Sequence, residues 1–240
     1  MDKHRVIRSA FKVGSFTLLS RLLGLIRDTL TASAFGTSAA MSDFVVAFRL
    51  PNLFRALFGE GALSSAFVPV FMATRGREGD ASAWQVARKT VTLVATFLLL
   101  LVVVGVVVIG VLMRTHPELA ARAPHLLPLA RIMLPYILFI CLAGLFMAML
   151  NACHQFSLPA FTPSLLNITW ILFVLFVCPR LGADPGLQIY GVAWAVFLAG
   201  LVQMGVLLPA LVRRGFRLGF TWDPRDERVR RVFRLMGPTA

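Results

Sequence analysis

Residues Val91–Met113 form an unbroken apolar stretch without a single charged side chain. The hydrocarbon core of a bilayer is about 30 Å thick, and a helix needs about 20 residues to cross it. Backbone polar groups in lipid must be satisfied within the segment, so such a stretch is typical of a membrane-spanning helix. Similar stretches recur along the chain, and only 15% of all residues are charged. The sequence therefore predicts an all-α polytopic membrane protein.

Hydrophobic stretches divide the chain into six predicted spans and the start of a seventh. The six spans are Val13–Ala34, Ser42–Met72, Val91–Met113, Leu126–Leu150, Ser164–Cys178 and Ile189–Val212. The closing residues LMGPTA look like the opening of the seventh. We expect residues 1–220 to form a six-helix lobe and residues 221–240 to form a basic segment that leads into the incomplete seventh span.

The segment TWDPRDERVRRVFRLM, residues 221–236, predicts a short helix of its own. Asp223 can cap its start, with Pro224 at the first helical position. One face is apolar and arginines surround the other, as in a helix that lies in the membrane interface. The apolar face holds Val229, Val232, Phe233 and Met236. An ordinary basic cytoplasmic linker remains the alternative.

The positive charges are distributed unevenly between the two ends of the predicted spans. If the N-terminus is cytoplasmic, the inner segments hold sixteen lysines and arginines, and the outer loops hold Arg114, Arg122 and Arg180. Cytoplasmic segments carry such an excess, so the N-terminus is predicted to lie inside. The inner sixteen are Lys3, Arg5, Arg8, Lys12, Arg75, Arg77, Arg88, Lys89, Arg213, Arg214, Arg217, Arg225, Arg228, Arg230, Arg231 and Arg234. This distribution accounts for most of the net charge of +13 without a nucleic-acid partner.

The first predicted span carries a polar stripe in an otherwise apolar helix. The stripe follows helical spacing along one face and comprises Thr17, Arg21, Gly24, Asp28 and Thr31, with Ser20 and Arg27 beside it. A charged residue in the middle of a spanning helix costs about 2.5–3.5 kcal/mol on insertion scales. We therefore expect the stripe to face a water-filled cavity or partner charges.

The second predicted span repeats this theme. Asn52, Arg55 and Gly59 share a helical face, and Glu60 lies on its flank. Pro51 removes a backbone hydrogen bond and is expected to bend the helix. Irregular backbone at membrane depth is tolerated where it lines a cavity, so the two spans are predicted to border one.

An anion site is our interpretation of Arg21, Arg27 and Arg55. Guanidinium groups bind phosphate oxygens bidentately and stay charged in surroundings of low dielectric constant. The sequence carries no Walker motif, no nucleotide fingerprint, no metal cluster and no catalytic triad pattern. We therefore expect no metal or cofactor site and no enzyme, and a secondary transporter or lipid flippase fits best.

Two structural alternatives remain open for these charges. Ion pairs such as Arg21 with Asp28, or Arg55 with Glu60, would only fasten the bundle. Arginines near the interfaces can instead extend their side chains to the membrane surface, and Arg49 fits this role as well as a functional one.

Residues 20–71 resemble the start of the MurJ/MviN family of bacterial lipid II flippases. The shared motifs are S-R-x-x-G-x-x-R-D, the F-G-T loop, the position of Asp43, R-L-P-N-L-F-R and F-x-E-G-A-x-S-x-A-F-x-P. The run LPYILFICLAGLFMAMLNACHQFSLPAFTP and the closing RLMGPTA are also similar to the family. The resemblance covers essentially the whole chain.

This resemblance implies a fold and a substrate. Family members belong to the multidrug/oligosaccharidyl-lipid/polysaccharide exporter superfamily, with two six-helix lobes around a cationic cavity and an extra helix pair. Their substrate is lipid II, the undecaprenyl-pyrophosphate-linked disaccharide pentapeptide. Arg21, Arg27 and Arg55 match the family's substrate-binding arginines. Asp28, Asp43 and Glu60 match acidic positions, and we expect these three and Asn52 to act as gating or charge partners.

The resemblance also implies a bacterial inner-membrane location, contact with membrane lipids and a C-terminal lobe that is missing from this chain. We expect the chain to be the N-terminal part of a larger flippase. The alternatives are another polyprenyl-linked oligosaccharide flippase of the superfamily, a cation-coupled drug antiporter, or a half-length membrane module that does not transport. The many arginines argue against the antiporter, which would need acidic residues facing the cavity.

Overall fold

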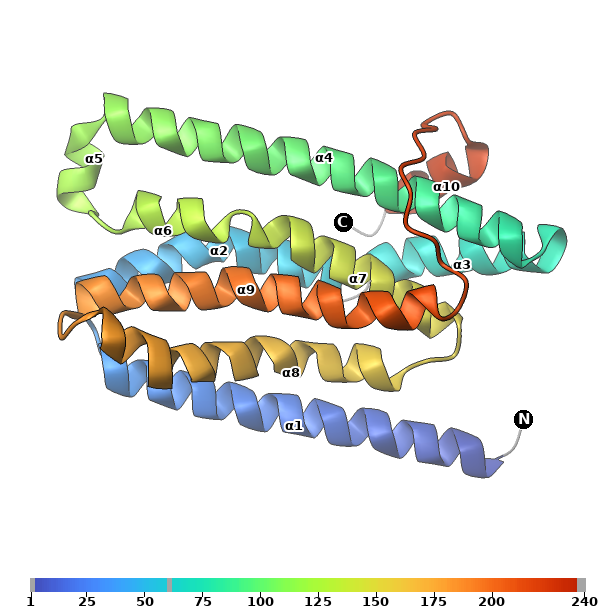
Figure 1. The fold of residues 1–240 in the computed structure, drawn as a ribbon, viewed down its shortest axis with the longest axis horizontal. Coiled ribbons are helices and arrows are strands. Elements are labelled where there is room, and N and C mark those ends of the chain that lie inside the picture. Colours follow the sequence, from blue (N-terminus) through green and yellow to red (C-terminus); the bar gives the residue numbers. More distant parts are fainter. Residues whose placement is uncertain (1–2, 60–61, 237–240) are drawn as a thin grey trace.

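The computed structural model describes residues 3–59 and 62–236, and every regular element within them is helical (Figure 1). The α-helices are α1 (Lys3–Phe35), α2 (Ala39–Gly59), α3 (Ala62–Glu78), α4 (Asp80–Thr115), α5 (Pro117–Arg122), α6 (Leu126–Met133), α7 (Tyr136–Ala152), α8 (Ser157–Leu172), α9 (Pro185–Val212) and α10 (Glu227–Met236). A π-helical turn, η1 (Phe173–Val177), and a 3-10 turn, η2 (Cys178–Leu181), extend α8.

The long helices lie side by side along one axis, with α4 and α1 on opposite sides of the bundle (Figure 1). Between them, α7 packs against α2, α3, α4 and α9, and α8 packs between α1 and α9. The N-terminal end of α1, the α3–α4 turn and α10 lie at one end of the bundle. The α1–α2 turn, α5 and the α8–α9 turn lie at the other end.

The centre of the bundle is formed by α7. The most apolar stretch of Leu126–Ala152 is 72% buried, whereas that of α4 is 17% buried. Small residues bring α9 close to this centre, because a Cβ atom at Gly200 would lie 2.7 Å from the Tyr136 ring. Small residues allow the same close approach between helices in membranes. The outer face of α4 is therefore not covered by the other described helices of the bundle.

Four described helical segments are long and apolar enough to cross a membrane. They are Asp80–Thr115, Leu126–Ala152, Ser157–Leu181 and Pro185–Val212. These segments contain the third to sixth predicted spans, so the prediction of an all-α membrane protein with several crossings is confirmed. The first two predicted spans correspond to α1 and to the α2–α3 pair. These helices carry Arg21, Arg27 and Arg55.

The second predicted span, Ser42–Met72, is divided into two helices. Helix α2 ends at Gly59 and α3 begins at Ala62, and Glu60 and Gly61 lie outside the described residues. Helix α2 contains Pro51 and continues beyond it to Gly59. A proline inside a membrane helix is tolerated where neighbouring helices and side chains satisfy the freed backbone group.

The fifth predicted span begins at the wrong residue. We placed its start at Ser164, after Pro163, but α8 begins at Ser157 and contains that proline. The prediction treated Pro163 as a helix boundary. A proline often marks such a boundary, but some helices continue through one. Proline does mark a boundary in the fourth span, which is divided into α6 and α7 at the turn around Pro135.

The predicted helix start at Asp223 is also wrong, because α10 begins at Glu227. Asp226 caps it instead, since its Oδ1 accepts the backbone N–H of Arg228 at 2.9 Å and its carbonyl accepts that of Arg230. Of the predicted apolar face, Val229 and Val232 are buried among residues of the bundle, whereas Phe233 is exposed. The predicted start of a seventh span, residues 237–240, lies outside the described residues.

Candidate functional site

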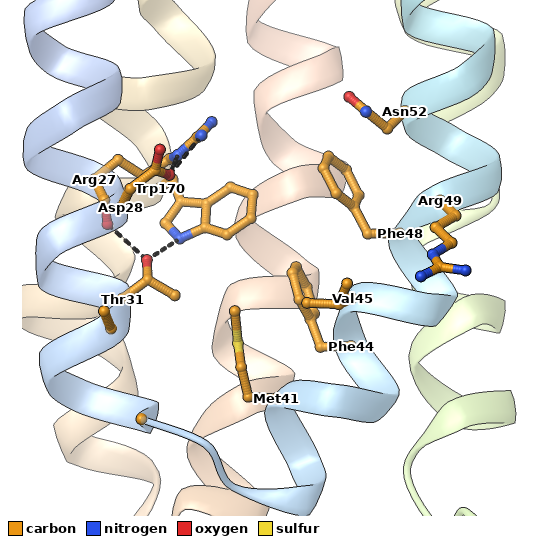
Figure 2. Close-up of a pocket in the computed structure, with 12 residues that line it drawn as sticks. Arg27, Asp28, Thr31, Met41, Phe44, Val45, Phe48, Arg49, Asn52 and Trp170 are labelled. Carbon is orange, nitrogen blue, oxygen red and sulfur yellow. Dashed lines mark hydrogen bonds and ion pairs between the residues drawn. The ribbon is translucent and has the colours of Figure 1, made fainter.

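A cavity of about 440 Å³ lies between α1, α2 and α8 (Figure 2). Its polar lining comes from Arg27 and Asp28 on α1 and from Arg49 and Asn52 on α2. The indole ring of Trp170, on α8, forms part of the wall between the two helices. The volume falls in the range of small-molecule sites, which are mostly apolar with a few placed polar groups.

The guanidinium group of Arg27 is fixed from three directions. Its Nε and Nη2 atoms donate to Asp28 Oδ1 at 2.9 and 2.7 Å, and Nη1 donates to Asn167 Oδ1 at 3.0 Å. Its Cζ atom also lies 5.0 Å from the centre of the Trp170 ring, within the range of a cation–π interaction. Arg27 therefore has one preferred direction, set by its neighbour on α1 and by two residues of α8.

A second set of hydrogen bonds joins α1 to α8 beside this group. The Nδ2 atom of Asn167 donates to the carbonyl of Ser20 at 2.9 Å. Trp170 Nε1 donates to Thr31 Oγ1 at 3.0 Å, and that hydroxyl donates to the carbonyl of Arg27 at 2.7 Å. Buried polar groups must be satisfied, so these bonds fix the register of the two helices.

The α2 side of the cavity carries the second arginine. Arg49 is exposed and lies across the cavity from Arg27 (Figure 2). One helical turn further along, Asn52 Oδ1 accepts a hydrogen bond from Arg55 Nε at 3.0 Å. This contact orients Arg55, which is half-buried. Asn52 thus belongs to the cavity wall and also contacts the next arginine of the helix.

The charges of the cavity do not cancel. The lining holds two arginines and one carboxylate, and the side chain of Asp28 is 66% exposed while that of Arg27 is 22% exposed. An ion pair so accessible to solvent contributes little to stability and can exchange partners readily. The arrangement can bind an anion through guanidinium groups, which form bidentate hydrogen bonds with oxyanions.

The structure places the predicted site residues in several locations. Arg27, Asp28 and Asn52 meet at the cavity, whereas Arg21 and Arg55 are not part of its lining. Asp43 lies elsewhere, where its Oδ2 accepts the backbone N–H of His125 at 3.1 Å, at the start of α6. Glu60 lies outside the described residues.

The predicted polar stripe of α1 is divided between two surroundings. Thr31 is buried against α8, and a Cβ atom at Gly24 would lie 3.7 Å from Asn167 Nδ2. Arg21 and Asp28 are exposed. Asp28 forms its ion pair with Arg27, whereas the pairing alternative had named Arg21. Adjacent residues on a helix point in different directions, but the long arginine side chain bridges this difference.

Sequence reasoning missed two residues that shape the cavity, Asn167 and Trp170, and left the role of Arg49 open. A signal existed for Asn167, because an amide inside an apolar span is costly unless it has a partner. Trp170 follows it by three residues and so lies on the same helical face. Arg49 precedes Asn52 by three residues on α2, and that spacing also indicated a shared face.

The fold and the site together define a class of protein. It is a helical integral membrane protein with several spans and a charged cavity between its helices, the class that includes membrane transporters. Residues 31–240 match the family model described as "Lipid II flippase MurJ". The chain belongs to this family.

Curated relatives agree with this assignment. The chain is 42% identical over 211 residues to the lipid II flippase MurJ of Burkholderia cenocepacia, covering 86% of this chain and 40% of that protein. It is 38% identical over 247 residues to the probable lipid II flippase MurJ of Bdellovibrio bacteriovorus, covering 99% of this chain and 46% of that protein. The chain thus spans less than half the length of these relatives.

A solved structure has the same fold. It is described as "Lipid II flippase MurJ, inward closed conformation", and it superposes with a TM-score of 0.69 at 25% sequence identity. The match covers 93% of this chain and 46% of that chain. In both sequence and structure, this chain therefore matches somewhat less than half of these longer proteins.

Proposed function

We propose that this chain is the N-terminal lobe of a lipid II flippase that moves undecaprenyl-pyrophosphate-linked disaccharide pentapeptide across the bacterial inner membrane. The observation that carries the proposal is a cavity lined by both Arg27 and Arg49 in a chain of the MurJ family. A pyrophosphate carries the charge that two guanidinium groups bind, and the cavity has room for it.

The ion pair of Arg27 and Asp28 supplies the means to bind and to release. In the empty cavity Asp28 neutralises Arg27 and lowers the cost of a charge at membrane depth. When the substrate enters, its phosphate oxygens replace the exposed carboxylate as the partner of Arg27. Because the bond to Asn167 remains in place, the arginine keeps its direction during the exchange. Such partner exchange favours one conformation over another, as alternating access requires.

Arg21 and Arg55 extend the proposed site beyond the cavity. Arg21 is exposed on α1, and Arg55 is directed by Asn52 on α2. In the proposed whole protein, a C-terminal lobe of similar size covers this side and completes a cationic central cavity. Asp28, Asp43, Glu60 and Asn52 are proposed as charge or gating partners within that arrangement.

The proposed topology has six crossings in this lobe. They are α1, the α2–α3 pair, α4, the α6–α7 pair, α8 with its terminal turns, and α9. The N-terminus is proposed to be cytoplasmic from the excess of positive charge in the inner segments. Helix α10 then lies at the cytoplasmic end of the bundle and leads into a seventh crossing.

The test is complementation of a flippase-depleted strain by the full-length protein with Arg21→Ala, Arg27→Ala or Arg55→Ala. We expect each variant to insert at normal abundance and to lose growth, because the substrate's charge loses a partner. Arg→Lys changes should be milder but not neutral, since an ammonium lacks the bidentate fork.

Arg180→Ala is the matched control, because this arginine lies in the exposed α8–α9 turn. It should complement fully. Normal growth with Arg21→Ala, Arg27→Ala and Arg55→Ala alike would overturn the proposed anion site.

A further inference from the structure

A second cavity lies on the outer face of the bundle, between α4 and the segment that includes α10. It is a groove of about 510 Å³. One wall comes from α4, with Phe97 and Leu100, and the other from Trp222, Val229 and Phe233. Among the described residues that line it, Arg230 alone is charged. The groove is therefore an apolar slot with one positive charge in its wall.

The groove continues the face of α4 that the bundle leaves uncovered. Phe97 and Leu100 are each 63% exposed, although they belong to an apolar membrane-spanning candidate. In a spanning helix, such an exposed apolar face is favourable against lipid acyl chains. The groove lies between α4 and the α10 segment, and Figure 1 shows α10 toward the end of the bundle that holds the N-terminal end of α1. In the proposed orientation this is the cytoplasmic leaflet.

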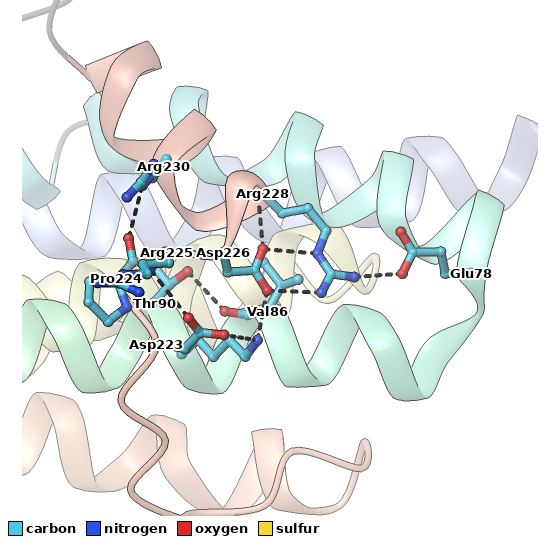
Figure 3. Close-up of polar contacts among 10 residues, drawn as sticks. Glu78, Val86, Thr90, Asp223, Pro224, Arg225, Asp226, Arg228 and Arg230 are labelled. Carbon is cyan, nitrogen blue, oxygen red and sulfur yellow. Dashed lines mark hydrogen bonds and ion pairs between the residues drawn. The ribbon is translucent and has the colours of Figure 1, made fainter.

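Arg230 is held at the groove by its own segment. Its Nε donates to the carbonyl of Pro224 at 3.1 Å (Figure 3). The side chain is exposed, so the guanidinium group remains accessible from the membrane surface. Arg231 and Arg234 add exposed positive charge on the same helix. Basic clusters at the cytoplasmic side of spanning helices attract anionic lipid headgroups.

A partly buried ionic network keeps this second wall in place. Lys89 Nζ donates to Asp223 Oδ2 and to Asp226 Oδ2, each at 2.7 Å. Arg228 then joins Asp226 to Glu78 of α3 (Figure 3). The side chains of Lys89 and Asp226 are only 9% and 5% exposed. The groove is thus preformed by contacts that do not use its own lining, which reduces the cost of binding.

We propose that this groove binds one phospholipid with an anionic headgroup, with an acyl chain between α4 and α10 and the phosphate at Arg230. This inference rests on the proposed orientation of the lobe. The charge of the wall selects the occupant, since an apolar slot alone would accept any acyl chain. A zwitterionic lipid carries a compensating cation and gains less from Arg230.

The test uses the full-length protein in phosphatidylcholine vesicles that contain brominated lipids, which quench nearby tryptophan. Trp222 lines the groove. Its contribution to the quenching is the difference between the wild-type protein and the Trp222→Phe variant. Brominated phosphatidylglycerol should quench Trp222 with about fivefold preference over brominated phosphatidylcholine, the factor that one arginine contributes at a membrane surface.

Two variant pairs locate the site. Arg230→Gln should abolish the preference, whereas Arg234→Gln, on the same helix but outside the groove, should keep it. Leu100→Trp should fill the groove and reduce quenching of Trp222 by both lipids. Leu99→Trp is its control, because Leu99 is also exposed on α4 but does not line the groove.

Three results would overturn the proposal. Equal quenching by the two lipids would show that the headgroup is not selected. Equal losses in Arg230→Gln and Arg234→Gln would show a diffuse attraction without a site. Absence of quenching by either lipid would show that another protein segment occupies the groove. The measurement requires no transport, so a failure of the proposed flippase function would leave its outcome interpretable.

Discussion

Asn167 of α8 fixes the direction of Arg27 of α1, with 3.0 Å between Asn167 Oδ1 and Arg27 Nη1. The same amide donates to the carbonyl of Ser20, so one side chain joins the helix backbone and the cavity arginine. Helix α8 thus determines where the charge of α1 points. The proposed anion site therefore depends on a residue that would not itself contact the substrate.

The variant Asn167→Ala should reduce transport without preventing insertion. A hydrogen bond to a charged group contributes about 1.5–3 kcal/mol, so we expect a reduction of roughly tenfold in complementation or in lipid II flipping at equal abundance. Asn167→Asp keeps the acceptor for Arg27 and loses the donor to Ser20, so it should retain most activity. Thr169→Ala on the same helix is the control. Equal loss in the alanine and aspartate variants would assign the effect to helix packing and not to Arg27.

Arg49 should contribute to substrate binding as Arg27 does. It lines the cavity from α2, so Arg49→Ala should impair complementation to a similar degree. Arg49→Lys distinguishes the two roles that the sequence left open. A binding role needs the bidentate guanidinium fork, and lysine should then recover only part of the activity. Full activity with lysine would identify Arg49 as an interface anchor. Arg114→Ala, at the far end of α4, should have no effect.

The sequence predicts the helices of this chain better than its contacts. Apolar length alone identified the segment around Val91–Met113, because only a helix can satisfy its backbone in lipid. The spacing of Arg27 and Asp28 did not reveal their pairing, because the pairing depends on the direction of the arginine side chain. That direction is set in part by Asn167, which is 140 residues away in the sequence. Likewise, the Lys89 network joins residues 134 and 137 positions apart. Such contacts depend on how helices pack, and a single sequence does not encode that directly.

Lys89 should stabilise the docking of α10 more than the bundle itself. Lys89→Met leaves Asp223 without its cation and Asp226 with Arg228 alone. Because Asp223 and Arg228 are partly exposed, we expect a loss below the value of about 3–5 kcal/mol for a fully buried pair. We expect faster proteolysis within residues 213–226 and a lower midpoint of thermal unfolding. The double variant Lys89→Met/Asp226→Asn should be less destabilised than the sum of the single changes. Arg77→Met, an exposed change on α3, serves as the control, and an additive double variant would contradict a direct interaction.

Acid should release the same segment. The hydrogen bond from Arg228, assisted by Lys89, holds the pKa of Asp226 well below its usual range. A lowered pKa in the folded state means that the carboxylate stabilises the fold above its unfolded pKa of about 3.9, and that this contribution is lost as the pH falls further. Trp222 fluorescence between pH 6 and pH 2.5 should report the loss. Asp226→Asn should flatten that part of the titration, and an unchanged titration would assign the transition to other groups.

Reporter fusions test the proposed orientation. The structure places the α3–α4 turn and the segment after α9 at the same end as the N-terminal end of α1, and α5 and the α8–α9 turn at the other end (Figure 1). A reporter after Arg77 or Arg217 should therefore be cytoplasmic, and one near Pro117 or Asp184 periplasmic. The excess of inner positive charge gives the sign of this pattern. A periplasmic signal at Arg217 together with a cytoplasmic one at Arg77 would break the six-crossing model, because the two sites would then be separated by an odd number of crossings.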